Sequence, residues 1–294
     1  MATAAQWVEG ARPRTLPAAV APVAAGTGAA AAADGFRLGP ALLALLVALA
    51  LQVGVNYAND YSDGVRGTDA DRVGPLRLVG SGVATPSAVK AAALAAFAVA
   101  GVAGLAVAAL SSWWLVAVGA ACLLAAWFYT GGRSPYGYRG LGEVSVFVFF
   151  GLVATVGTTF AQLLDVTVVS VLAGAGCGSL ACALLVANNL RDRPKDQAVG
   201  KRTLAVRLGD RRTRLFYVGL MVLPFVLLPQ IAAYYAWGLV ALVAAVLAVP
   251  PALAVGRGAA GRDLVPVLKA TGLTLLAYGV VLGVALALAG RGAG

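Results

Sequence analysis

Long apolar runs separated by short polar connections make up most of this sequence. A helix needs about 20 apolar residues to cross the hydrocarbon core of a bilayer, and nine runs are read as such helices by length and apolarity. The run at the N-terminal end is the weakest of the set. The pattern predicts an all-α integral membrane protein of about nine transmembrane helices in one domain, at residues 15–33, 40–60, 89–110, 113–130, 142–162, 166–189, 213–230, 232–254 and 265–289.

The second apolar run ends in a stripe of polar side chains. Spacings of three and four place five of them on one face of a helix, namely Gln52, Asn56, Asn59, Asp60 and Asp63. An uncompensated acid at mid-bilayer costs roughly 2.5–3.5 kcal/mol on insertion scales. A divalent cation is the simplest compensation, because hard cations take carboxylate and amide oxygens as ligands. The stripe therefore predicts a cation site where this helix leaves the hydrocarbon.

A related motif stands at the end of the sixth apolar run. Asn188, Asp192 and Asp196 are spaced by four, so that an amide and two acids again share one helical face. Pro194 lies between the two acids and disfavours a regular helix across them. Because a basic loop follows each motif, the chain is interpreted as two weakly related helical halves, at about 1–140 and 141–294.

Composition supports a membrane protein and excludes some chemistries. The chain is 61% hydrophobic and 12% charged, with a mean hydropathy of +0.87, which is typical of many membrane-spanning helices. Histidine is absent, so imidazole bases, histidine-ligated metals and Ser-His-Asp triads are excluded. The three cysteines lie in apolar runs without metal-ligand spacing, and we interpret them as packing residues.

The net charge of +10 would suggest a nucleic-acid partner for a soluble protein, but here the basic residues report topology. Of the 22 Lys and Arg residues, 20 lie in the N-terminal segment, in the connections after the second, fourth, sixth and eighth helices, or at the helix ends beside them. Only Arg37 and Arg291 lie on the other side. The positive-inside rule predicts a bacterial-type cell membrane protein with a cytoplasmic N-terminus and an external C-terminus.

Two carboxylate motifs that face each other suit two or three Mg²⁺ ions, which commonly keep open positions for phosphate oxygens. Basic residues near the motifs are candidates to clamp the outer oxygens of a diphosphate. These residues are Lys201, Arg202, Arg72 and Arg77, with Asn59 beside them.

Several segments resemble a known family. The segments Asn59 to Asp69, Asp192 to Asp196 and Gly200 to Gly209 resemble the UbiA superfamily of intramembrane aromatic prenyltransferases. Three further segments resemble its 1,4-dihydroxy-2-naphthoate polyprenyltransferase branch, namely A-R-P-R-T-L-P-A from Ala11, D-R-V-G-P-L-R-L-V-G-S-G from Asp71 and Y-T-G-G-R-S-P-Y-G-Y-R-G-L-G-E-V from Tyr129.

The resemblance implies nine helices around a central cavity that opens laterally to lipid. It implies Mg²⁺-dependent transfer of a polyprenyl group from its diphosphate to 1,4-dihydroxy-2-naphthoate, with loss of CO₂ and diphosphate. Gly67 stands where the superfamily has a further acid, and Asp69 is the expected substitute. The implied catalytic acids are Asp60, Asp63, Asp192 and Asp196, and the implied metal ligands are these four with Asn59, Asp69 and Asn188.

The residues that hold the aromatic acceptor remain open at this point. Arginines near the charged loops are candidates for its carboxylate, and polar or aromatic side chains are candidates for its ring; together these are Arg12, Arg14, Arg139, Tyr129, Gln52 and Asn56. Another acceptor, such as 4-hydroxybenzoate, is the first alternative. A cation-coupled secondary transporter is the second, although its acids are expected near the bilayer midplane and not at one end.

Overall fold

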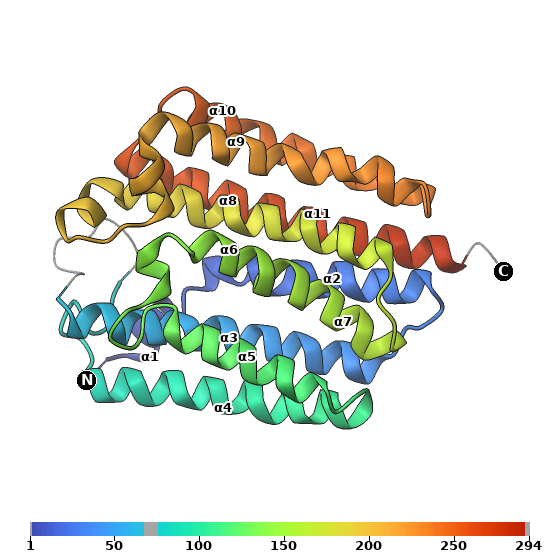
Figure 1. Cartoon of the computed structure of the whole chain (residues 1–294), viewed down its shortest axis with the longest axis horizontal. Helices are drawn as coiled ribbons and strands as arrows, with labels where there is room; N and C mark the ends of the chain where they lie inside the picture. Colours follow the sequence, from blue (N-terminus) through green and yellow to red (C-terminus); the bar gives the residue numbers. More distant parts are fainter. Residues whose placement is uncertain (1, 68–75, 292–294) are drawn as a thin grey trace.

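Helices account for almost all of the described chain, as the apolar runs predict. The structure is a computed structural model that describes residues 2–67 and 76–291, and no strand occurs within these ranges. The helices run side by side along one common direction (Figure 1). The first half holds α1 (Ala4–Gly10), η1 (Pro13–Thr15), α2 (Pro17–Ala32), α3 (Leu38–Val65), α4 (Pro86–Leu110), α5 (Leu115–Phe128) and η2 (Tyr136–Arg139). The second half holds α6 (Gly142–Val146), η3 (Phe147–Val153), α7 (Ala154–Leu163), α8 (Val168–Ala198), α9 (Leu204–Ala232), η4 (Ala236–Ala244), α10 (Ala245–Gly256), η5 (Gly261–Asp263) and α11 (Leu264–Arg291).

The predicted spans correspond closely to these elements. Seven helices of the described residues are long and apolar enough to cross a membrane. An eighth span results if the N-terminal pair, bent by 50° before Pro17–Ala32, is taken as one. The remaining predicted span is the short apolar helix α5, Leu115–Phe128. The prediction of about nine helices is therefore confirmed as an approximation.

Both acidic motifs lie at the same end of the bundle. α3 and α8 end there, next to the N-terminus and the α8–α9 connection, whereas the C-terminus and the α2–α3 and α7–α8 connections lie at the opposite end (Figure 1). We call the first of these the charged end. Because neighbouring spans alternate in direction, α3 and α8 end on the same side of the bundle although they are far apart in sequence.

The alanine-rich helix α2 is an inner helix, although it is the weakest span by sequence. A side chain added at Gly28 would place Cβ 2.2 Å from the carbonyl oxygen of Gly283 in α11. The same addition at Gly283 would place Cβ 2.3 Å from the Ala24 oxygen. Small residues let the two backbones approach closely, which stabilises helix pairs by van der Waals contact in lipid.

The π-helical segment after α6 and the proline near the end of α8 are the local features closest to the predicted site. Phe147–Val153 forms a π-helical stretch between α6 and α7, a type of bulge that often occurs at functional sites. α8 continues through Pro194 to Ala198, although Pro194 was expected to disfavour a regular helix there. Pro194 has no backbone N–H, so the Leu190 carbonyl lacks its usual helical partner, and the helix continues for only four residues beyond the proline.

Candidate active site

A cavity of about 1380 Å³ begins at the charged end and extends between the helices. Charged and amide side chains line one part of it, among them Asp63, Arg77, Asn188, Asp192, Asp196 and Lys201. Small and apolar side chains line the remainder, among them Ala48, Leu51, Gly104, Ala120, Phe149 and Leu185. The cavity thus offers a polar mouth and an apolar interior, which suits an amphiphilic ligand.

The structure brings most of the predicted site residues to this cavity. Those that line it are Gln52, Asn56, Asn59, Asp63, Arg77, Asn188, Asp192, Asp196 and Lys201, together with Arg12, Arg14 and Tyr129. Asp60, Arg139 and Arg202 do not line it. Asp69 and Arg72 lie outside the described residues.

Three side chains at the charged end contact the carboxylate of Asp63. Its Oδ1 accepts hydrogen bonds from the Tyr138 hydroxyl and from Lys201 Nζ, the latter at 3.2 Å. Arg77 Nη2 lies 3.7 Å from its Oδ2. Burial and the nearby Asp63 carboxylate raise the pKa of Tyr138, so this hydroxyl stays protonated and donates. Lys201 also lies over the Tyr138 ring, 4.3 Å from its centroid.

A second ion pair holds the acidic motif of α8. Arg191 contacts Asp192 through two hydrogen bonds, Nε to Oδ1 at 2.7 Å and Nη2 to Oδ2 at 2.8 Å. Its Nη2 also donates to Asn188 Oδ1 at 2.7 Å. Arg191 is buried and was not among the predicted site residues. Its position between Asn188 and Asp192 in the motif is the signal that could have identified it.

The described acids of the two motifs do not form a cluster of metal ligands. Among residues 2–67 and 76–291, no group of three Asp, Glu or Cys side chains could together hold a metal ion. Asp63 and Asp192 instead contact basic side chains.

Asp60 has a different environment from the one its motif suggests. It is fully buried, and its two carboxylate oxygens accept from the backbone N–H groups of Leu78 and Val79, at 2.7 and 3.1 Å. These bonds attach the loop after residue 75 to α3, next to Arg77. The bonds fix the backbone beside Arg77, and Asp60 does not line the cavity. Its assignment as a metal ligand stays a prediction.

We expect Asp60→Ala to destabilise the protein, because it leaves the buried Leu78 N–H without an acceptor, at a cost of about 1–3 kcal/mol. The melting temperature of the purified protein should fall, and proteases should cleave residues 76–84 more readily. Asp60→Asn keeps one side-chain oxygen and should lie between the alanine variant and wild type. An unchanged melting temperature with complete loss of turnover would show instead that Asp60 acts on the ligands directly.

Two arginines expected at the site point elsewhere. Arg139 and Arg202 are exposed, and neither lines the cavity. The backbone N–H of Arg202 donates to the Tyr138 carbonyl at 2.9 Å, so this segment supports Tyr138 while the chain turns outward into α9. The roles predicted for both arginine side chains are therefore not supported by their positions.

Glu143 and Asn189 form a buried pair beside the cavity. Asn189 Nδ2 donates to Glu143 Oε1 at 3.0 Å, and Glu143 Oε2 has no hydrogen-bond partner among residues 2–67 and 76–291. Asn189 lines the cavity. The first turn of a helix favours an acid, which was sufficient to account for Glu143 by sequence, so the pairing with α8 could be found only in the structure.

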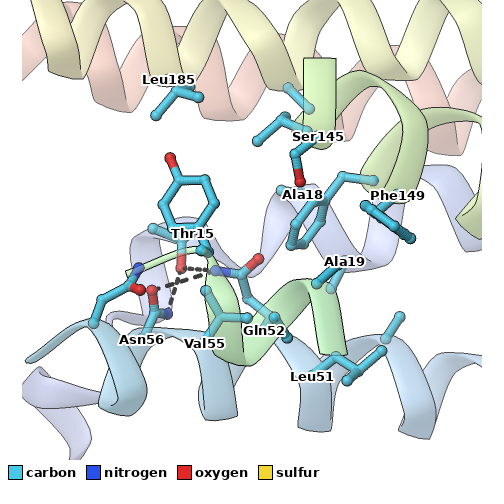
Figure 2. A pocket seen from close by; sticks show the side chains of 18 of the residues that line it. Thr15, Ala18, Ala19, Leu51, Gln52, Val55, Asn56, Ser145, Phe149 and Leu185 are labelled. Atoms are coloured by element: carbon cyan, nitrogen blue, oxygen red, sulfur yellow. Dashed lines mark hydrogen bonds between the residues drawn. The ribbon is translucent and has the colours of Figure 1, made fainter. Parts of the chain in front are cut away.

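Gln52 and Asn56 line the cavity one helical turn apart, and both contact Thr15 of η1 (Figure 2). Gln52 Nε2 and Asn56 Nδ2 each donate to the Thr15 hydroxyl oxygen at 2.9 Å. Thr15 was not singled out by sequence, although it lies in the R-P-R-T segment that carries part of the family resemblance.

The sequence matches the UbiA prenyltransferase family over residues 19–263. The chain is 56% identical over 287 residues to a 1,4-dihydroxy-2-naphthoate octaprenyltransferase of Mycobacterium tuberculosis, with 98% of each chain covered. A protein of the same name from Escherichia coli is 38% identical over 275 residues, which cover 90% of this chain and 89% of that relative.

Solved structures share the fold at low sequence identity. A UbiA homologue from Aeropyrum pernix superimposes with a TM-score of 0.72 at 17% identity, covering 91% of this chain and 97% of that one. A UbiA homologue from Archaeoglobus fulgidus, bound to DMAPP and Mg²⁺, has a TM-score of 0.58 at 16% identity, covering 95% of this chain and 99% of that one. The similarity extends over nearly the whole bundle.

Proposed function

Because the chain belongs to the UbiA prenyltransferase family, we propose that it transfers a polyprenyl group from polyprenyl diphosphate to 1,4-dihydroxy-2-naphthoate, a step of menaquinone biosynthesis. The observation that carries the proposal is the 56% identity over 98% of the chain to a relative of that named activity. The charged mouth and apolar interior of the cavity support a donor with a diphosphate head and a hydrocarbon tail.

The side chains at the mouth suit Mg²⁺ bound to diphosphate. Asp63, Asp192 and Asp196 offer carboxylate oxygens and line one cavity with two asparagines, Asn59 and Asn188, and Mg²⁺ prefers such oxygen ligands while leaving positions for phosphate. Mg²⁺ bound to a homologue together with DMAPP supports the same assignment. When bound, the metal would neutralise the charge that grows on the departing diphosphate.

Lys201 and Arg77 are the residues that we assign to the outer diphosphate oxygens. Both contact Asp63, so a diphosphate at this mouth would meet two cations that the protein already holds in place. Preorganised cations stabilise a developing anion without having to move during the reaction. Tyr138 keeps Lys201 near Asp63 through its ring and its hydroxyl.

The proposed reaction needs no base from the protein. The bond between the first prenyl carbon and the diphosphate oxygen breaks, and its electron pair leaves with the diphosphate. The ring carbon that bears the carboxylate bonds to the prenyl carbon. The electron pair of the bond to the carboxylate then returns to the ring, and CO₂ leaves. This sequence is consistent with a chain that has no histidine.

We further propose that the charged end faces the cytoplasm of a bacterial cell. The support is that the N-terminal segment and the connections assigned to that side by sequence, with the helix ends beside them, hold 20 of the 22 Lys and Arg residues, since cytoplasmic loops of membrane proteins are enriched in basic residues. The N-terminus would then be cytoplasmic and the C-terminus external. This orientation would present the diphosphate site to soluble substrates made inside the cell.

We expect the purified protein in lipid vesicles to prenylate 1,4-dihydroxy-2-naphthoate when polyprenyl diphosphate and Mg²⁺ are supplied, with release of CO₂. Parallel reactions contain 4-hydroxybenzoate, and mass spectrometry identifies the products. A product from 4-hydroxybenzoate alone would contradict the naphthoate assignment and support another aromatic acceptor. Cation flux across the vesicles without any prenylated product would support the transporter alternative.

A further inference from the structure

We propose that the side-chain carbonyl oxygen of Gln52 accepts a hydrogen bond from a hydroxyl of the aromatic acceptor, and that Thr15 is the positioning residue that orients this carbonyl. The proposal rests on the proposed function, because it assigns a substrate contact within the same cavity. It adds a residue that selects the acceptor by its hydroxyl group.

The hydrogen bonds around the Thr15 hydroxyl determine how the Gln52 amide is oriented. The Thr15 hydroxyl donates to the Arg12 carbonyl at 2.9 Å, so its oxygen is left to accept. A hydroxyl oxygen has two acceptor positions, and the amide nitrogens of Gln52 and Asn56 fill both. Asn56 Nδ2 uses its other hydrogen on the Ala11 carbonyl at 2.9 Å. The backbone carbonyls of residues 11 and 12 thus determine which way both amides face.

The side-chain oxygen of Gln52 is the acceptor that this network leaves unused. The second N–H of Gln52 donates to Asn56 Oδ1 at 3.4 Å. Gln52 Oε1 accepts no hydrogen bond from any residue of the described ranges, although the side chain lines the cavity and is only 6% exposed. The oxygen is accessible from the cavity, so a ligand there that donates a hydrogen can take the place of water at this acceptor.

The surroundings of Gln52 suit an aromatic ring. The amide oxygen lies on the side of Gln52 away from Thr15, in the part of the cavity that Ala19, Ser145 and Phe149 border (Figure 2). Small and apolar side chains leave space for a flat ring, and Phe149 offers an aromatic surface for stacking.

The distance along α3 determines which hydroxyl would reach Gln52. Gln52 precedes Asp63 by three helical turns, or about 16 Å at 1.5 Å per residue. That span accommodates a diphosphate at Asp63 followed by a bicyclic ring. The 1-hydroxyl of the naphthoate is adjacent to its carboxylate and can bond to it internally. The free donor is therefore the 4-hydroxyl, on the side of the ring away from the carboxylate.

The test compares 1,4-dihydroxy-2-naphthoate with 1-hydroxy-2-naphthoate, which keeps the hydroxyl next to the reacting carbon and lacks the other. Wild type should prefer the dihydroxy compound by roughly tenfold or more in kcat/KM, because the analogue leaves Gln52 Oε1 unpaired. Gln52→Met should abolish this preference by lowering kcat/KM for the dihydroxy compound alone. KM for the prenyl diphosphate should stay unchanged.

Thr15 is tested through the same ratio. Thr15→Val keeps the shape of the side chain but removes the hydroxyl, so the Gln52 amide is free to turn and the preference should fall several-fold. Thr15→Ser restores the hydroxyl and should restore the preference. A purely structural role of Thr15 would lower the activity with both naphthoates equally and leave their ratio unchanged.

Gln162→Met is a matched control. Gln162 is also a buried glutamine that donates to a threonine hydroxyl, Thr27 Oγ1 at 3.2 Å, but it lies near the end of α7, away from the charged end (Figure 1). For the Gln162→Met variant, the ratio of kcat/KM for the two naphthoates should equal the wild-type ratio. The proposal is overturned if Gln52→Met keeps the preference, or if wild type uses both naphthoates equally well, a measurement that needs no variant. Failure of wild type to prenylate either naphthoate would instead overturn the proposed function.

Discussion

Replacing Asp63 with alanine should lower kcat/KM for prenyl transfer on the order of a thousandfold, which is the scale of removing a main electrostatic group from an active site. Asp63 contacts Lys201, Tyr138 and Arg77, so the substitution removes a proposed ion ligand and also frees the two cations that we assign to the diphosphate. The measurement is the rate of prenylated product formation in lipid vesicles with saturating Mg²⁺.

Asp165→Ala is the matched control for this experiment. Asp165 is exposed in the α7–α8 connection at the opposite end of the bundle, and its removal should leave kcat/KM within twofold of wild type. Circular dichroism and size-exclusion chromatography should show that both variants keep their helical content and remain monodisperse. An Asp63→Ala protein that retains more than about a tenth of wild-type activity would contradict the role given to this acid.

Removal of divalent metal should abolish prenyl transfer. Without the ion, the negative diphosphate would face Asp63, Asp192 and Asp196 at one mouth, and like charges at such short range disfavour binding. We expect no detectable transfer in EDTA and full recovery when excess Mg²⁺ is added. Pyrophosphate should raise the melting temperature only when Mg²⁺ is present, which tests binding independently of turnover.

The Asp192→Ala variant separates an effect on metal from a general loss of structure. It should need a higher Mg²⁺ concentration for half-maximal stabilisation by pyrophosphate, because one proposed ligand is missing. Asp165→Ala should titrate as wild type does. Persistence of prenyl transfer after exhaustive dialysis against chelator would contradict the metal requirement, and the diphosphate would then depend on Lys201 and Arg77 alone.

Much of the architecture could be predicted from local sequence. The apolar runs predicted the membrane-spanning helices. A backbone in lipid must satisfy its hydrogen bonds within each helix, so an apolar run of sufficient length forms a helix. The alternation of charged connections placed the ends of α3 and α8 together, as Figure 1 confirms. Asp63, Asp192 and Asp196 line one cavity, as the placement of both motifs at helix ends on one side of the membrane predicted, while their roles stay predictions.

Other features of the site could not be predicted, because they depend on contacts between segments far apart in the chain. Asp60 belongs to the acidic motif, yet it contacts the backbone of Leu78 and Val79. Arg202 adjoins Lys201, yet its side chain is exposed. Neighbouring residues in a loop face different directions, and spacing alone does not say which direction leads to the cavity.

The sequence by itself determined that this chain is a multi-helix membrane protein of the UbiA family with two acidic motifs at one end, because hydropathy, helical periodicity and motif spacing are local properties. Only the tertiary structure decided that Asp63 contacts Lys201 and Arg77. It also decided that Asp60 accepts hydrogen bonds from the backbone of Leu78 and Val79. It likewise decided that Gln52 of α3 donates a hydrogen bond to Thr15 of η1. Hydrogen-bond partners are chosen when helices pack, because a buried polar group must find a donor or acceptor among whatever the fold brings near it.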